Sequence, residues 1–118
     1  MRAVILFAHG SRDPLWKRPI EAIAGRLRKL RPDARVVCAY LELDTPDLAA
    51  AAHDLVQSGV RHITVLPMFL GIGRHARADL PLLVQAVQRA HPELALELRN
   101  AVGEDERVLD LLACIAAE

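Results

Sequence analysis

Two kinds of apolar pattern alternate along the chain. Short continuous apolar runs, of which residues 3–8 are the first, are typical of strands buried on both faces of a sheet. Between them, apolar residues recur every three or four positions, which indicates the buried face of a helix. The expected elements, in order, are a strand over 3–8, a helix with Trp16, Ile20, Ile23, Leu27 and Leu30, a strand over 35–41, a helix with Leu48, Ala52, Leu55 and Val56, a strand over 62–69, a helix with Leu80, Leu83, Val84 and Val87, a short strand with Leu94, Leu96 and Leu98, and a helix with Val108, Leu111, Leu112 and Ile115.

Prolines mark where several of these helices begin and end. Asp13-Pro14 and Thr45-Pro46 are helix-start signals, because an acidic or hydroxyl side chain can cap a helix that begins with proline. Arg31-Pro32 and His91-Pro92 are expected to end the first and third helices, since proline cannot continue a helix. Residues 70–75 are predicted to form a loop before the third helix.

The alternation of strands and helices predicts an α/β fold. A strand, a helix and a second parallel strand form a crossover unit, which is right-handed in nearly all proteins. We therefore expect a three-layer domain, with a four-stranded parallel sheet and helices on both faces. No linker or low-complexity segment interrupts the pattern, so residues 1–118 are predicted to form a single domain.

Charge and composition narrow the classes of function. The 15 basic and 15 acidic side chains cancel, whereas general nucleic-acid binding depends on an excess of Lys and Arg. Only Phe7, Trp16, Tyr40 and Phe69 are aromatic, which is too few for stacking on bases. No stretch approaches the ~20 apolar residues of a membrane span, and the run over 3–8 is too short for a secretory signal. We expect a cytoplasmic protein that binds neither nucleic acid nor membranes.

Candidate chemistry follows three of the expected strands. His9 comes directly after the first strand, Glu42 after the second and His75 after the third. Ligands of open α/β sheets bind beyond the carboxyl ends of the strands, so the fold is expected to bring these side chains to one edge. Two imidazoles and one carboxylate can bind a first-row divalent metal and leave other coordination positions open.

Each of these residues also has an ordinary structural explanation. His9 could cap its strand or hydrogen-bond to the following loop, Glu42 could be a solvated loop carboxylate, and His75 could simply begin a helix. Asp79 is expected to cap the third helix, or alternatively to support the histidines from behind. The sequence alone leaves these alternatives open.

Three arginines, Arg12, Arg74 and Arg77, flank the two histidines. Exposed arginines often serve only to keep a surface solvated. A cluster at the ligand-binding edge nevertheless indicates recognition of carboxylates or phosphates, which a guanidinium group binds in a bidentate manner.

Several familiar motifs are absent. Gly71 and Gly73 lack the third glycine of a dinucleotide-binding loop. Ser11 has no adjacent Asp–His relay, which disfavours a serine hydrolase. Cys38 and Cys114 belong to no C-x-x-C pair, so we expect two reduced thiols.

Ordered segments across the chain resemble a known family. These segments are Ala8-His-Gly-Ser-Arg-Asp-Pro14, Tyr40-Leu-Glu-Leu43, Leu66-Pro-Met-Phe-Leu70, Gly73-Arg-His75 and Asp79-Leu-Pro81. Together they are similar to the small sirohydrochlorin chelatases, class II chelatases related to the cobalt-inserting enzymes of cobalamin synthesis and the iron-inserting enzymes of sirohaem synthesis. The resemblance extends over about residues 1–115.

The resemblance implies a chelatase-like fold and insertion of cobalt or iron into sirohydrochlorin. It makes His9, Glu42 and His75 the catalytic and metal-handling positions. The divalent metal, Co²⁺, Fe²⁺ or Ni²⁺, is then a substrate, and no tightly bound cofactor is expected. The candidate substrate-binding residues are Ser11, Arg12, Met68, Leu70, Gly71, Ile72, Gly73, Arg74 and Arg77.

The resemblance also bears on assembly. Larger relatives contain two such units in one chain, whereas this sequence contains one, so similarity to the short forms implies a homodimer. Some relatives carry a histidine-rich tail. This sequence finishes Ala116-Ala117-Glu118, so metal storage through such a tail is not expected.

Two other functions remain open at this point. A non-catalytic carrier of metal or tetrapyrrole could use the same site. His9-Gly10 also resembles part of the Arg-His-Gly motif of phosphatases, but Ala8 stands where the phosphate-binding arginine would be. Phosphoryl transfer therefore ranks third.

Overall fold

One parallel sheet forms the centre of the protein. The computed structural model describes residues 1–118 and contains the four strands and four helices that the sequence predicts, together with one short 3₁₀ helix. The elements are β1 (Arg2–Ala8), α1 (Arg18–Leu30), β2 (Ala34–Tyr40), α2 (Leu48–Gln57), β3 (His62–Pro67), α3 (Arg74–Ala90), β4 (Ala95–Leu98), η1 (Val102–Glu104) and α4 (Glu106–Ala116).

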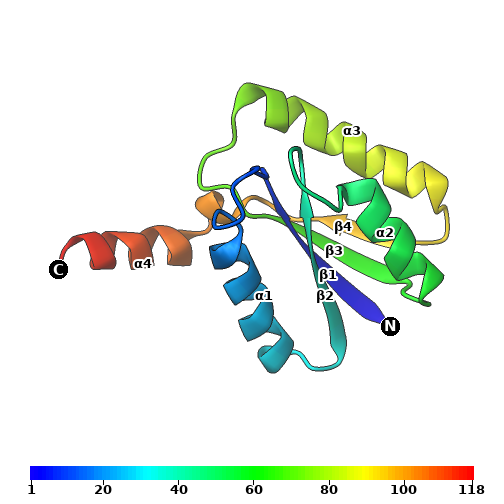
Figure 1. The fold of residues 1–118 in the computed structure, drawn as a ribbon, viewed down its shortest axis with the longest axis horizontal. Coiled ribbons are helices and arrows are strands. Elements are labelled where there is room, and N and C mark those ends of the chain that lie inside the picture. The colour runs from blue at the N-terminus through cyan, green and yellow to red at the C-terminus, as the bar shows by residue number, and fades with distance from the viewer.

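The strands lie in the order β2-β1-β3-β4, and all three pairings are parallel. Helices α2 and α3 cover one face of the sheet and α1 covers the other, as Figure 1 shows. This arrangement confirms the predicted three-layer α/β fold. Ala8 pairs with Tyr40 and Phe7 with Pro67, so the carboxyl ends of β1, β2 and β3 lie at one edge.

The two faces of the sheet are buried to different extents. Ile5 and Phe7 of β1 point towards α2 and α3 and belong to a core cluster of 17 buried residues. Leu6 points the other way and forms a cluster of only three buried residues with Ala24 of α1 and Val36 of β2. Because α1 packs mainly on β1 and β2, it leaves the β3 and β4 part of this face less covered.

The first helix begins later than the sequence predicts. Residues 14–17 form a turn, and α1 starts at Arg18 with Pro19 in its first turn. The Asp13 carboxylate caps that turn by accepting a hydrogen bond from the Leu15 N–H at 2.9 Å. An Asp-Pro pair suits a turn as well as a helix start, and here it forms the turn.

The second helix is capped by Asp47 and not by the predicted Thr45. The Asp47 carboxylate accepts a hydrogen bond from the Ala50 N–H at 2.8 Å. The capping residue therefore lies two positions after the predicted Thr45, on the other side of Pro46. The predicted helix itself is present.

The third helix begins earlier than predicted. Its first residue is Arg74, and Gly73 precedes it without any side-chain cap. The predicted loop over 70–75 is therefore too long by two residues, and His75 lies in the first helical turn. Asp79 lies inside the helix and does not cap it, because glycine can occupy the position before a helix without a capping side chain.

The C-terminal segment leaves the body of the domain. Gly103 of η1 approaches the loop after β3 so closely that a β-carbon there would overlap the Leu70 carbonyl. Helix α4 then extends away from the sheet (Figure 1), and none of its residues is buried. None of the helices has both the length and the apolar composition that a membrane crossing requires.

Candidate active site

Strands β1 and β2 stay paired beyond their ends. The Leu41 N–H donates to the Ala8 carbonyl at 2.8 Å, and the Glu42 N–H donates to the His9 carbonyl at 2.9 Å. Gly10 follows with a φ of 101°, a left-handed conformation that glycine adopts at little cost. A β-carbon on this residue would overlap the Glu42 carbonyl. The backbone thus holds His9 and Glu42 on adjacent segments.

The imidazole of His9 lies on an aromatic support. Its ring centroid is 4.2 Å from that of Phe69, with 33° between the ring planes. Phe69 is 2% exposed, and its ring meets Phe7 edge-on with centroids 6.1 Å apart. His9 itself remains exposed to solvent. Sequence reasoning missed Phe69, because it continues the apolar run of the third strand and was interpreted as part of that strand.

His75 and Asp79 lie one turn apart on α3. A spacing of four residues places two side chains on the same side of a helix, and both residues line the same pocket. The Arg77 N–H donates to the Gly73 carbonyl at 2.9 Å and closes the first helical turn. Asp79 and His75 therefore face the same pocket, and a role of Asp79 in supporting His75 stays a prediction.

One open pocket brings the three predicted residues together. It has a volume of about 520 Å³, and His9 from the loop after β1, Glu42 from the loop after β2 and His75 from α3 all line it. The fold therefore gathers these side chains at one edge, as expected. They are not preassembled as a metal cage, since no group of three or more His, Cys, Asp or Glu side chains is arranged to hold an ion. The pocket is lined by His9, Leu41, Glu42, Gly73, Arg74, His75, Ala76 and Asp79.

The three arginines are free of acidic partners within the chain. Arg74 lines the pocket, and Arg12 and Arg77 are exposed in the loop after β1 and in the first turns of α3. None of them takes part in any of the ion pairs of the structure. Their guanidinium groups are available to an anionic ligand.

Most of the other predicted substrate contacts do not line this pocket. Met68 and Ile72 are half-buried against the α1-side cluster and the main core respectively, so they contribute to packing. The Ser11 hydroxyl accepts a hydrogen bond from a backbone N–H two residues further on, at 3.0 Å. Leu70 is 63% exposed, and Gly71 has open space around it. Leu70 and Gly71, like the pocket-lining Gly73, present free surface on the loop after β3.

Tyr40 closes the base of the loop that carries Glu42. It is 3% exposed, and its N–H donates to the Pro46 carbonyl at 2.9 Å. Its ring meets Trp16 edge-on with centroids 6.4 Å apart. Burial raises the pKa of the Tyr40 phenol to about 12, so this side chain stays neutral and serves the loop structurally.

Comparison with known proteins identifies the family. A family model described as CbiX matches residues 3–118. The chain belongs to the CbiX family. The match confirms the resemblance that the ordered sequence segments indicate. Among its relatives, the sirohydrochlorin ferrochelatase of Priestia megaterium is 30% identical over 113 residues, covering 95% of this chain and 42% of the relative. This chain thus spans less than half the length of that relative.

Solved structures of CbiX-type proteins have the same fold. A cobalamin (vitamin B12) biosynthesis CbiX protein from Marinobacter aquaeolei VT8 is 29% identical with a TM-score of 0.86, covering 99% of this chain and 95% of its own. The sirohydrochlorin chelatase SirB from Bacillus subtilis subspecies spizizenii, solved in complex with cobalt, is 25% identical with a TM-score of 0.80, covering 98% of this chain and 50% of its own. The chelatase-like fold is confirmed.

Proposed function

We propose that this protein is a sirohydrochlorin chelatase, which inserts cobalt or iron into the macrocycle in cobalamin or sirohaem synthesis. The observation that carries the proposal is the shared pocket of His9, Glu42 and His75. These residues come from three separate segments and have the chemistry of metal ligands and proton acceptors. The names of the relatives support the same reaction and substrate.

Metal insertion requires that the ion loses water, that the pyrrole nitrogens become accessible, and that two N–H protons leave the macrocycle. The imidazoles of His9 and His75 would present the metal and accept these protons. The Glu42 carboxylate would balance the charge of the ion or relay a proton.

Sirohydrochlorin carries eight carboxylates, which gives the unpaired arginines a role. Arg74 lines the pocket. Arg12 and Arg77 are exposed, and they follow His9 and His75 closely in the sequence. Charge-assisted hydrogen bonds from these groups would hold the rim of the macrocycle. Leu70 and Gly71 present surface against which the ring could lie.

In this proposal the catalytically active form of the protein is a homodimer. The chain covers 50% of the SirB chain, and a second copy would supply a surface comparable with the remaining half. A cytoplasmic location remains a prediction from the sequence.

An anaerobic insertion assay tests the function. Purified protein is mixed with excess sirohydrochlorin and with Co²⁺ or Fe²⁺ supplied separately, and the absorption of the macrocycle is followed. Many metallated macrocycles per chain support the enzyme. Conversion that stops at one macrocycle per chain would identify a carrier, and no acceleration over the reaction without protein would contradict the proposal.

A further inference from the structure

Helix α4 carries an apolar stripe that nothing in its own chain covers. Val108, Leu111, Leu112 and Ile115 recur at spacings of three and four and so share one face of the helix. Leu111 is 61% exposed and Ile115 is 55% exposed. Figure 1 shows the whole helix standing clear of the sheet. A contiguous apolar surface of this kind on a monomer is typical of a site that binds another molecule.

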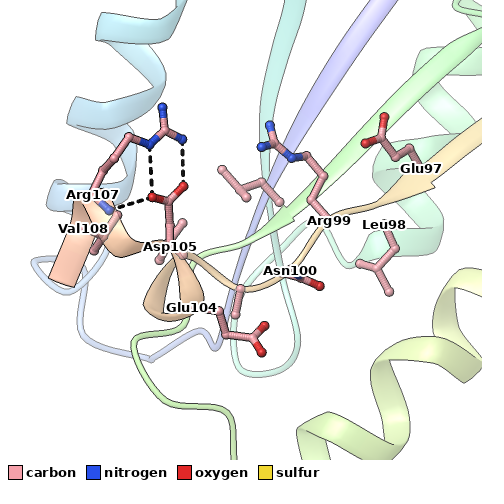
Figure 2. Close-up of a pocket in the computed structure, with 11 residues that line it drawn as sticks. Glu97, Leu98, Arg99, Asn100, Glu104, Asp105, Arg107 and Val108 are labelled. Atoms are coloured by element: carbon pink, nitrogen blue, oxygen red, sulfur yellow. Dashed lines mark hydrogen bonds and ion pairs between the residues drawn. The ribbon is translucent and has the colours of Figure 1, made fainter.

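A groove on the α1 side of the sheet could receive such a helix, since about half of the residues that line it are apolar and the others are polar or charged. One part of it, of about 600 Å³, lies at the base of α4 beside Arg99 and Val108 (Figure 2), and Leu66 also lines it. A second part, of about 360 Å³, lies between α1 and the sheet beside Val4 and Leu27. Leu66, Glu97 and Arg99 line both parts, so the groove is continuous along β3 and β4.

The length of α4 fits this groove. A helix of 11 residues is about 17 Å long. Strand β3 has six residues, which span about 20 Å. One α4 helix can therefore span the half-buried positions of β3 on this face. It would remove from water the part of the sheet that α1 leaves open.

Charge fits as well. The far end of the groove is lined by Arg2 and Arg99, by Arg31, which is already paired with Asp33, and by the single acid Glu97. The last turn of α4 contains no basic residue, and Glu118 follows it. The negative end of a helix dipole and an acidic side chain are favourable partners for arginines. Glu106 and Asp110, near the start of α4, fall on the side of the helix opposite the stripe and would remain in water.

We propose that α4 is exchanged between two copies of this chain, each helix lying in the α1-side groove of the other. The inference rests on the homodimer of the proposed function and specifies its interface. It does not depend on the chelatase reaction. Because the same chain carries both the stripe and the groove, two copies can make the contact in both directions. The result is a closed symmetric dimer with no free stripe or groove.

A pair of substitutions tests the role of the stripe. Leu111→Glu places a charge on the stripe, and Leu82→Glu makes the same change on α3 at an equal exposure of 61%. Wild type and L82E are expected to be dimers by light scattering. L111E is expected to dissociate at least about tenfold more readily, with unchanged helix content by circular dichroism. Dimers of equal strength in all three proteins would overturn the exchange while leaving a homodimer, and a monomeric wild type would overturn both.

Cross-linking between two different chains tests the groove. Both chains carry Cys38→Ser. One retains Cys114 on α4, and the other carries Cys114→Ser with Thr64→Cys in the groove. A short bis-maleimide is expected to join the two chains when they are mixed. A control with Leu82→Cys in place of Thr64→Cys should give no product. Absence of the mixed product in a dimeric protein would contradict the exchange, whatever the outcome of the insertion assay.

Discussion

Gly10 and Glu42 are in direct backbone contact. The α-carbon of Gly10 faces the Glu42 carbonyl at a distance where no β-carbon fits, and Gly10 has a φ of 101°. The contact holds the loop after β1 against the loop after β2. Because Gly10 directly follows His9 and the Glu42 N–H donates to the His9 carbonyl, the contact helps to set the separation of His9 from Glu42.

Gly10→Ala is expected to destabilise the fold and displace Glu42. A non-glycine residue at positive φ costs about 1–3 kcal/mol, and the overlap with the Glu42 carbonyl adds to it. Thermal unfolding should show a clear loss, and metal insertion should fall in the folded fraction. The control is Gly25→Ala in α1, where a β-carbon meets nothing and should stabilise by about 0.5–1 kcal/mol. Equal stability of the two variants would refute the role of the contact.

Substitution of the arginines is expected to weaken substrate binding more than turnover. Arg74→Gln and Arg77→Gln each remove one charge that is not used in any internal ion pair. The KM for sirohydrochlorin should rise about tenfold, with kcat much less affected. Arg89→Gln, in the last turn of the same helix, should leave both parameters unchanged. If all three variants behaved alike, the two arginines near His75 would have no special part in binding.

The two cysteines are expected to react at different rates. Burial raises the pKa of the Cys38 thiol, so less of it is thiolate, the reactive form, at neutral pH. Cys114 is exposed on α4. Alkylation of the L111E variant, in which α4 is not held by a second copy, with iodoacetamide at pH 8, followed by mass spectrometry, should modify Cys114 first. Earlier modification of Cys38, or a disulfide between the two in the purified protein, would be inconsistent with this structure.

Asp105 at the start of α4 should titrate at unusually low pH. Hydrogen bonds from the Arg107 guanidinium and backbone N–H lower the pKa of this carboxyl from 3.8 to about 2. Since the pKa is lowered by folding, the ionised carboxylate stabilises the cap above about pH 3.8, and this contribution is lost as the pH falls through about 2. An NMR titration of the Asp105 carboxyl measures the midpoint.

Arg107→Ala should move that midpoint up towards 3.8, whereas Arg99→Ala should move it only slightly, because Arg99 has the smallest of the effects on Asp105. If the Arg107→Ala substitution left the midpoint unchanged, the Arg107–Asp105 ion pair drawn in Figure 2 would not form in solution.

The sequence predicts the layers of this fold better than its details. Continuous apolar runs such as 3–8 locate the strands, because only a doubly buried strand needs them. The start of α1 was misplaced since Asp13-Pro14 suits a turn equally well. The stripe on α4 predicts a helix correctly, but its periodicity cannot say what covers it. That depends on the surface left open between α1 and β4, which only the assembled sheet defines.

For the candidate site, the sequence likewise predicts which residues come together but not their detailed contacts. His9, Glu42 and His75 could be located because parallel strands bring their carboxyl ends to one edge. The stacking of His9 on Phe69 could not, since it depends on where the chain turns after β3. Asp79 was assigned to the wrong helix position for the same reason, because the start of α3 sets which residues face the pocket.

The most direct test of the account is the rate of metal insertion in single histidine variants, measured anaerobically in the presence of excess sirohydrochlorin and Co²⁺. His9→Ala and His75→Ala should each lose at least about 100-fold in rate while keeping the wild-type unfolding temperature to within a few degrees. His53→Ala, an exposed histidine on α2 outside the pocket, should retain full activity. Wild-type rates in both pocket variants would contradict the claim that these imidazoles carry out the reaction.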